Sequence, residues 1–359
     1  MLQLHQLTKN NKINQVKFLL NKSKCNINEL NNNGDTALLI ASKKNYIALA
    51  EILIKYGANP NIHNEYGRTP LFYAVMNSSL KMIQLLINSG AETNYKDFMG
   101  YTPICNVRYS DDVEILKFLL DNGAEIDVRN MYGDTPLFSL ISNDSIKTTK
   151  KLIEMGANVN AKNVNDETPL IEAIIGGYTE LVQVLIDAGA KVNAKTKSGL
   201  TPIFNATRAN SFKIAQILIN SGANVKIKDK NERTPLFLAS YYNSVDVIDL
   251  LLKMGIDVND RDKFGQTALF FAVQNNSVEA VKFLINSGAD INILNEDREN
   301  PMFWVVIKNS LEIARILINA GINIDQPNRK GETPITIAES KQSDQMLDLL
   351  MFNGDYSSF

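Results

Sequence analysis

The sequence predicts an all-α solenoid, in which pairs of short helices stack side by side into one elongated domain. Three observations predict this fold class. A threonine recurs every 33 residues, a glycine recurs at a second position of the same frame, and each interval contains two short apolar segments of helical character. One such unit cannot bury its apolar face alone, so neighbouring units must stack on it.

The two landmarks keep one register from Thr36 to Gly354, with no insertion. The threonine positions are Thr36, Thr69, Thr102, Thr135, Thr168, Thr201, Thr234, Thr267, Asn300 and Thr333. The glycine positions are Gly57, Gly90, Gly123, Gly156, Gly189, Gly222, Gly255, Gly288, Gly321 and Gly354. We therefore interpret the repeat before any local motif.

The first half of a unit is represented by GRTPLFYAV at residues 67–75. We expect Thr69 to be the N-cap of a short helix, with its hydroxyl accepting a backbone N–H, and Pro70 to occupy the first helical position. The position of Phe72 is apolar in most units, which predicts a buried apolar column through the core. Its members are Leu39, Phe72, Cys105, Phe138, Ile171, Phe204, Phe237, Phe270, Phe303 and Thr336.

The second half of a unit begins with an Asn that tolerates a left-handed backbone, as at Asn45, Asn210, Asn243, Asn276 and Asn309, or with Gly177. A second capping residue follows, at Ser79, Ser145, Ser211, Ser244, Ser277, Ser310 and Ser343, with Asp112 in the equivalent place. Amphipathic segments such as VEAVKFLI at 278–285 then predict a second helix, which ends at a glycine such as Gly288. The remaining polar link predicts a hairpin-like connector.

The ends and a few units depart from the pattern. We predict one domain over residues 1–359, with an atypical N-terminal capping repeat at 1–33, nine repeats of 33 residues over 34–330, and a C-terminal capping repeat with a short tail at 331–359. A first helix is expected near Leu2–Leu7 and a last one over Ser343–Met351, followed by a tail at 355–359. Asp166, Glu232 and Arg298 replace the turn glycine. Val107, Leu140 and Val305 replace a small Ala where the helices pack closely, which predicts local changes in curvature.

Composition limits the classes of function. The chain has 359 residues, 45% of them hydrophobic and 21% charged, with a net charge of -2. That balance argues against nucleic-acid binding, which needs a strong basic excess. No apolar run approaches the roughly 20 residues that span a bilayer, and the start has no apolar signal segment. Two distant cysteines, Cys25 and Cys105, suit a reducing compartment, so we expect a cytoplasmic protein, with export or a nuclear location left open.

The sequence contains no recognisable catalytic or metal-binding motif. Its only histidines are His5 and His63, and neither cysteine belongs to a zinc-ligand pattern. Phosphate-binding and dinucleotide-binding glycine motifs are missing as well. We therefore expect no enzyme activity, no cofactor and no metal, and we expect Cys105 to be a core residue.

The spacing and the motifs together resemble the ankyrin repeat family. The residues that carry the resemblance are GRTPLFYAV at 67–75, GDTPLFSLI at 133–141 and GANVNAKN at 156–163, within a period of 33 residues over nearly the whole chain. The resemblance implies antiparallel helix pairs with β-hairpin fingers, curved so that fingers and first helices line a concave face.

Aromatic and Met residues at the predicted finger tips and on the neighbouring inner face of the first helices are the candidate binding residues. Polar residues are expected at the tips, whereas apolar ones are enriched at interfaces. The primary cluster consists of Tyr66, Tyr73, Met76, Phe98, Met99, Tyr101, Tyr109, Met131 and Tyr132. A secondary cluster consists of Tyr241, Tyr242, Phe264, Phe271 and Trp304. The alternative for both is structural: the rings of the first stiffen neighbouring fingers, and Trp304 fills a gap in an irregular unit.

Basic residues dominate the fingers between the two clusters, at Lys195, Lys197, Lys228, Lys230, Arg233, Arg261 and Lys263. They favour an acidic partner, although charges on exposed loops often only face solvent. The predicted function is a non-catalytic, monomeric scaffold or adaptor that binds another protein. The alternatives are a regulatory or targeting subunit of an enzyme complex and a structural spacer.

Overall fold

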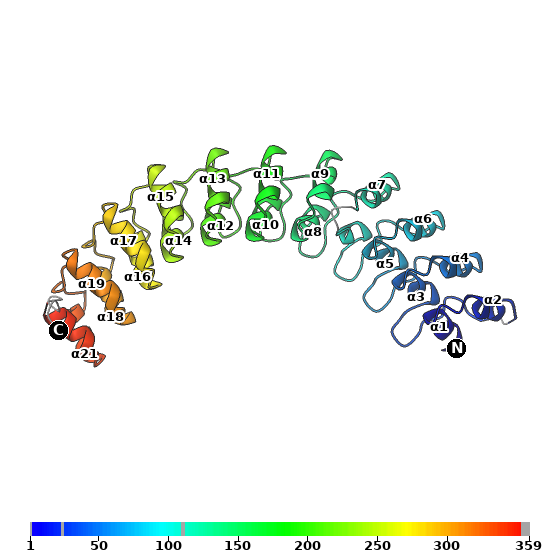
Figure 1. The fold of residues 1–359 in the computed structure, drawn as a ribbon, viewed down its shortest axis with the longest axis horizontal. Coiled ribbons are helices and arrows are strands. Elements are labelled where there is room, and N and C mark those ends of the chain that lie inside the picture. Colours follow the sequence, from blue (N-terminus) through cyan, green and yellow to red (C-terminus); the bar gives the residue numbers. More distant parts are fainter. Residues whose placement is uncertain (1, 23–24, 109–111, 353–359) are drawn as a thin grey trace. The chain divides into compact units, whose positions relative to one another are not determined.

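The structure is a computed structural model that describes residues 2–22, 25–108 and 112–352. Within these ranges it contains α-helices, one 3-10 helix and no strand. The chain divides into two units, Met1–Ala190 (unit 1) and Lys191–Phe359 (unit 2). Each unit consists of consecutive antiparallel helix pairs joined by connectors, as Figure 1 shows. The predicted all-α stack of helix pairs is therefore confirmed.

The helices follow the predicted order in both units. Unit 1 contains α1 (Leu2–Lys9), α2 (Ile13–Lys22), α3 (Ala37–Lys43), α4 (Ile47–Lys55), α5 (Pro70–Met76), α6 (Leu80–Asn88), η1 (Pro103–Asn106), α7 (Val113–Asp121), α8 (Pro136–Ser142), α9 (Ile146–Glu154), α10 (Pro169–Ile175) and α11 (Thr179–Asp187). Unit 2 contains α12 (Pro202–Arg208), α13 (Phe212–Asn220), α14 (Pro235–Tyr241), α15 (Val245–Lys253), α16 (Ala268–Gln274), α17 (Val278–Asn286), α18 (Pro301–Lys308), α19 (Leu311–Asn319), α20 (Pro334–Ser340) and α21 (Asp344–Met351).

Within each unit, first helices pack on the first helices of neighbouring repeats, and second helices pack on second helices. In unit 1 the first helices α3, α5, η1, α8 and α10 form one row, and the second helices α4, α6, α7, α9 and α11 form the other. The helices expected at the two ends are present as α1 and α21, whereas the predicted tail at 355–359 lies outside the described residues.

The predicted apolar column is buried. Phe72, Phe204, Phe237, Phe270 and Phe303 are fully buried, and Phe138 is 4% exposed. Fully burying a side chain of this size stabilises a fold by roughly 1.5–3 kcal/mol. The column ends at the last repeat, because Thr336 is exposed.

The hydroxyls at the helix starts make fewer capping bonds than the sequence predicts. Thr69 is the N-cap of α5, but its side chain makes no capping hydrogen bond and is buried without a partner. The N–H of Phe72, which the hydroxyl was expected to accept, donates instead to the backbone oxygen of Thr69 at 3.1 Å. Thr36 does cap as expected, accepting from the N–H of Leu39 at 3.1 Å.

The serines before the second helices also differ from the expectation. Ser277 is the N-cap of α17 without a side-chain capping bond, and its hydroxyl donates to the backbone oxygen of Tyr241 at 2.7 Å. Ser343 donates to Oδ1 of Asn309 at 2.8 Å. These hydroxyls therefore attach one repeat to the first helix of the repeat before it.

Left-handed turns separate the two helices of the pairs whose connecting residues the structure describes, as predicted. Asn45 has a φ of 55° and Gly177 a φ of 73°. The finger turns keep the same backbone where glycine is replaced, with φ of 58° at Asp166, 63° at Glu232 and 62° at Arg298. Non-glycine residues pay a steric cost of about 1–2 kcal/mol in this region.

One first helix is shorter than the others. It is the 3-10 helix η1, which spans Pro103–Asn106 and ends where Val107 becomes extended, at φ -67° and ψ 120°. Arg108 directly follows this end and is exposed, whereas the equivalent residues of the neighbouring first helices, Val75 in α5 and Ile141 in α8, are buried. Because a charged side chain is costly to bury, the helix ends before this position. We did not predict this shortening from the sequence.

Side-chain amides connect several connectors to the next one. In unit 1, Nδ2 of Asn61 donates to the backbone oxygen of Gly90 at 2.9 Å, and its Oδ1 accepts from the N–H of Glu92 at 2.8 Å. In unit 2, Asn259 makes the same two bonds, to Gly288 at 3.3 Å and from Asp290 at 2.8 Å. One amide therefore satisfies two backbone groups of the following repeat.

Candidate partner-binding surface

Each finger is a compact turn closed by one side chain at its base. In the finger at 61–68, Oδ1 of Asn64 accepts from the N–H groups of Tyr66 and Arg68, both at 3.1 Å. The backbone adds a bond from the Gly67 N–H to the Asn64 oxygen at 2.9 Å. The resemblance implied β-hairpin fingers, but the described connectors are turns held in this way and contain no strand.

Sequence reasoning missed this position at the finger base. Its members are Asn31, Asn64, Asp97, Asn130, Asn163, Thr196, Asp229, Asp262, Asn295 and Asn328. They recur with the same period as the threonines, and that was the available signal. Asn, Asp and Thr share a side-chain oxygen that can accept from the backbone two and four residues ahead.

Backbone hydrogen bonds join consecutive fingertips in unit 1. The N–H of Phe98 donates to the oxygen of Tyr66 at 3.3 Å, and that of Met131 donates to the oxygen of Met99 at 2.9 Å. A third bond runs from the N–H of Val164 to the oxygen of Tyr132 at 2.9 Å. The structure therefore brings the tip members of the primary cluster into one row.

The side chains of this row are exposed. Tyr66 is 58% exposed, Phe98 68%, Met131 60% and Tyr132 43%. Met99 is 39% exposed. Contiguous exposed apolar side chains of this kind are characteristic of interaction surfaces.

Phe98 also packs on its neighbours. Its ring meets that of His63 edge-on, with 5.5 Å between the centroids. A Cβ at Gly67 would lie 2.7 Å from the Phe98 nitrogen, so only glycine permits this approach of the two fingers. Phe98 can therefore both stiffen the neighbouring fingers, as the structural alternative predicts, and present an exposed apolar face.

The inner members of the primary cluster are half-buried. The hydroxyl of Tyr73 accepts from Nδ2 of Asn64 at 2.8 Å, and Lys43 Nζ lies 4.8 Å from the centre of its ring. Met76 and Tyr101 are also half-buried, and burial raises the pKa of the Tyr101 hydroxyl. Tyr109 lies outside the described residues.

A cleft of about 550 Å³ lies beside the row, at the shortened helix η1. Tyr101, Cys105 and Asn106 contribute from the η1 repeat, and α8 and α10 contribute Phe138 and Glu172. The other lining residues are Arg68, Arg108, Asp134, Ser139, Ser142, Asn143 and Asn163. The cleft thus combines two arginines and two carboxylates with an aromatic wall.

Several of these groups already have partners. Nε of Arg68 lies 3.2 Å from Oδ2 of Asp97, which is almost fully buried. Glu172 accepts from the Ser142 hydroxyl at 2.8 Å. Burial raises the pKa of the Cys105 thiol, so the thiol stays protonated near neutral pH and is a poor nucleophile. The expected burial of Cys105 is confirmed.

The secondary cluster of unit 2 divides into exposed and buried members. Tyr242 and Phe264 are exposed, at 39% and 45%. Tyr241 and Trp304 are half-buried and pack on a core of Phe237, Phe270 and Phe271.

Phe271 has too little exposed surface for a partner. It is 7% exposed, its ring meets Phe237 edge-on at 5.3 Å, and the Arg233 guanidinium lies 4.6 Å from its ring centre. We therefore remove Phe271 from the candidate surface. For Trp304, the packing agrees with the gap-filling alternative.

Both histidines bond to backbone oxygens, His5 to Glu29 at 3.0 Å and His63 to Asn64 at 2.9 Å. Among the described residues no group of three or more His, Cys, Asp or Glu side chains is arranged to hold a metal ion. Within the same residues, no helix has the length and apolar character needed to cross a membrane.

The family described as "Ankyrin repeats (3 copies)" matches residues 4–97, 104–196, 157–229, 203–295 and 269–358. The chain belongs to the ankyrin repeat family. Ankyrin repeats are generally protein–protein interaction modules, and their fold is typically non-catalytic. The one gap between matches, at 98–103, ends at the first residue of η1 and contains three residues of the primary cluster.

Solved structures of other ankyrin repeat proteins resemble this chain. One is the ankyrin repeat domain of Bcl-3, described as a unique member of the IkappaB protein family. It is 26% identical, with a TM-score of 0.53, over 61% of this chain and 99% of that domain. Among curated proteins, none matches this ankyrin repeat chain at a significant level.

Proposed function

We propose that this chain is a non-catalytic scaffold or adaptor that binds a partner protein through the fingers and first helices of unit 1. The observation that carries the proposal is the row of exposed apolar tips at Tyr66, Phe98, Met131 and Tyr132, which backbone hydrogen bonds hold in register. A rigid row loses little conformational entropy on binding, so moderate contacts suffice for affinity.

The cleft beside η1 gives the same surface a recess. A partner segment lying across the tips can place one side chain there, where the Tyr101 and Phe138 rings meet the polar groups of Arg108 and Asp134. Interfaces combine an apolar centre with such polar positions at the edge. The membership in a family of interaction modules supports the proposal in general terms.

The proposal is tested with random peptides displayed on phage and selected on the full chain. We expect selected peptides to be rich in apolar residues. The double variant Phe98→Ala with Tyr132→Ala should bind them about tenfold more weakly or worse, because buried aromatic contacts dominate interface energies. Circular dichroism should show unchanged helix content, since both side chains are exposed.

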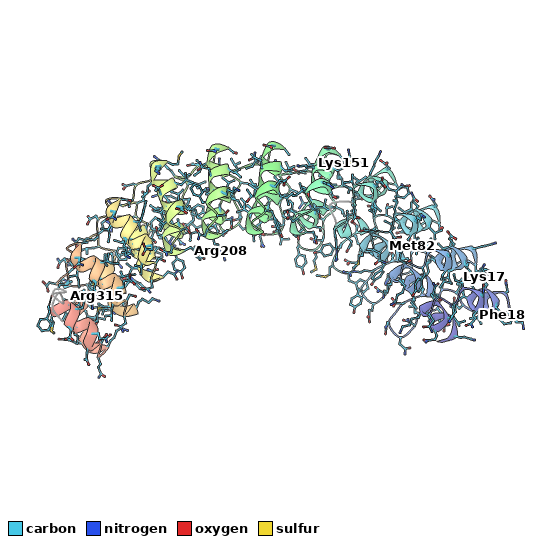
Figure 2. The ribbon with its side chains drawn as sticks, viewed as in Figure 1. Lys17, Phe18, Met82, Lys151, Arg208 and Arg315 are labelled. Carbon is cyan, nitrogen blue, oxygen red and sulfur yellow. The ribbon has the colours of Figure 1, made fainter. Side chains whose placement is uncertain are left out.

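The matched control is Phe18→Ala on α2, a second helix, labelled in Figure 2. Phe18 is 61% exposed, close to the exposure of Phe98, but lies away from the fingertip row. Its loss should leave peptide affinity unchanged. Equal binding by the double variant and the wild type would overturn the proposal and favour a structural spacer, which should instead fail when a whole repeat is deleted.

A further inference from the structure

Three consecutive fingers of unit 2 have more positive charge than the fingers of unit 1, whereas the next finger, at 292–299, contains one basic and three acidic residues. The three fingers, at 193–200, 226–233 and 259–266, contain eight basic and four acidic residues. The fingers of unit 1 at 61–68, 94–101 and 127–134 contain three basic and four acidic residues. Exposed Arg208, at the end of the first helix α12, adds another positive charge on the first-helix side of unit 2 (Figure 2).

Three of these basic residues occupy one position of the repeat. Lys197, Lys230 and Lys263 are each separated by one period, and all three are exposed at the fingertips. We call them the basic tip row. A Cβ at Gly199 would lie 3.3 Å from Cγ of Lys230, and the N–H of Lys263 donates to the oxygen of Asn231 at 3.0 Å. The three fingers are therefore direct neighbours.

The carboxylates at the bases of these fingers are occupied. Oδ1 of Asp229 accepts from the N–H groups of Asn231 at 2.7 Å and Arg233 at 3.0 Å. Asp262 has a fully buried side chain that accepts from two backbone N–H groups and from Nε of Arg233. These acids are bonded within the turns, whereas the lysines of the basic tip row are exposed.

Two acidic residues remain near the surface. Asp260 lies 3.8 Å from Nζ of Lys228, and Glu232 is exposed. Together with the two base carboxylates they leave an excess of four positive charges on the three fingers. This excess is concentrated where a partner lying across the tips would make contact.

The spacing of the basic tip row matches an extended chain. Packed helices lie about 8–10 Å apart, so equivalent tips of consecutive repeats are separated by about the same distance. A peptide in the extended polyproline II conformation advances about 3.1 Å per residue with three residues per turn, so every third side chain faces the same side and is separated by about one finger spacing. Acidic side chains at every third residue would therefore meet one lysine each.

We propose that the basic tip row of unit 2 binds an extended acidic segment of a partner protein, with carboxylates three residues apart. The inference rests on the proposed function in using fingertips as contacts, but it concerns different residues and a different unit. Phe264, which is exposed and lies 4.9 Å from Nζ of Lys263, offers an apolar contact at the end of the row.

An acidic protein segment fits this surface better than a nucleic acid does. A nucleic-acid strand carries a charge about every 3.4 Å, and its binding depends on releasing many counterions. The basic tip row offers one lysine per finger, and the whole chain has a net charge of -2. The wide spacing of the lysines and the local excess of positive charge therefore favour carboxylates on an extended protein segment.

The test uses fluorescein-labelled peptides and the full chain, with affinity measured by fluorescence anisotropy at low and at physiological salt. The first peptide has Glu at every third position between Ser and Gly residues. The second has the same composition with its Glu residues in one block. A single-stranded oligonucleotide of equal charge is the third ligand.

We expect the spaced peptide to bind best and the triple variant Lys197→Glu, Lys230→Glu, Lys263→Glu to bind it at least about tenfold more weakly. The difference in affinity between the wild type and the triple variant should shrink as added salt shortens the Debye screening length from roughly 30 Å to roughly 8 Å. These residues are exposed, so the helix content should not change.

The matched control reverses three exposed basic residues on second helices of the same unit: Lys213→Glu on α13, Lys253→Glu on α15 and Arg315→Glu on α19, the last labelled in Figure 2. It changes the net charge equally and should retain binding. The proposal is overturned if control and tip-row variants lose the same affinity, if the blocked peptide binds as well as the spaced one, or if the oligonucleotide binds best.

The variant Phe98→Ala with Tyr132→Ala separates the two proposals. It should bind the spaced acidic peptide as the wild type does, because its changes lie in unit 1. Loss of apolar-peptide binding with retained acidic-peptide binding supports both surfaces. Retained binding of both ligands contradicts only the proposed function.

Discussion

Arg233 and Asp262 form an ion pair between consecutive fingers of unit 2, with Nε 3.1 Å from Oδ2. The same guanidinium lies over the ring of Phe271, 4.6 Å from its centre. Unit 1 contains an equivalent pair, Arg68 and Asp97, at 3.2 Å. The carboxylate of each pair also closes its own finger, so one side chain determines both the shape of a finger and its attachment to the finger before it.

Removing this carboxylate should destabilise unit 2. Asp262→Ala leaves the N–H groups of Phe264 and Gln266 and the Arg233 guanidinium without their acceptor, which we expect to cost about 3–5 kcal/mol. Asp262→Asn should cost much less, because Asn closes the equivalent turn at Asn295. Urea unfolding followed by circular dichroism measures both. Equal losses for the two variants would contradict the role of the turn.

The buried phenylalanine column makes a second prediction. Phe237→Ala creates a cavity in a fully buried site and should lower the free energy of unfolding by about 3–5 kcal/mol. Phe212→Ala is the control in the same unit, since Phe212 lies on second helix α13 and is 44% exposed. The control should change stability by less than about 1 kcal/mol. Similar losses for both would mean that the column is not a main source of stability.

The left-handed finger turns make a third prediction, with opposite signs at two sites. Gly67→Ala should destabilise by about 1–3 kcal/mol, because a Cβ would clash with the Phe98 backbone at a φ of 76°. Glu232→Gly should stabilise slightly, by less than about 1 kcal/mol. It removes the steric cost of a φ of 63°, and the greater conformational freedom that glycine gives the unfolded chain offsets part of this gain. Thermal unfolding midpoints report both changes, and a lower midpoint for Glu232→Gly would be the contrary result.

The buried thiol predicts a dependence on pH. Burial raises the pKa of Cys105 above its ordinary value of 9.0 in the folded chain. Below about pH 9 the thiol is protonated in both states, so its contribution is complete there. As the pH rises further, the unfolded chain ionises first and stability falls until the pH passes the raised folded pKa.

We therefore expect the urea midpoint of the wild type to fall as the pH rises above about 9, and to fall less in Cys105→Ala. Tyr101, whose pKa is also raised by burial, contributes to the fall only above its ordinary value of 10.0. In native buffer, alkylation should modify half-buried Cys25 before Cys105. Faster modification of Cys105 would contradict its protected position.

The repeat made most of the fold predictable from the sequence. The positions of Thr69, Pro70 and Phe72 specify a helix start and a buried column, because one period fixes each residue relative to its copies in neighbouring units. Hydrogen-bond details were less predictable. The hydroxyl of Thr69 has a competitor, the backbone oxygen of the same residue, and only the geometry of the first turn decides between them.

The candidate surface was predictable at the tips and less so on the first helices. Tyr66 and Phe98 precede a turn glycine, a place that is exposed by construction. Tyr73 and Phe271 occupy the same repeat position, yet Tyr73 is half-buried and Phe271 is buried. The difference comes from neighbours: Arg233 lies over Phe271, and Trp304 packs against its cluster. Exposure at this position therefore depends on adjacent repeats.

Among the described connectors, one lacks the side-chain oxygen that accepts a backbone N–H of the next connector. The position of Asn61 and Asn259 is taken by Lys226, whose side chain has no oxygen to accept a backbone N–H and instead reaches toward Gly255, with Nζ 3.6 Å from the place of a Cβ there. In a chain whose repeats are coupled mainly to their neighbours, one weaker interface between repeats limits how far cooperative unfolding extends. Amide protons around Asp257 and Val258 should exchange with solvent faster than those around Asp290 and Ile291, so that unit 2 opens internally before it unfolds from its ends.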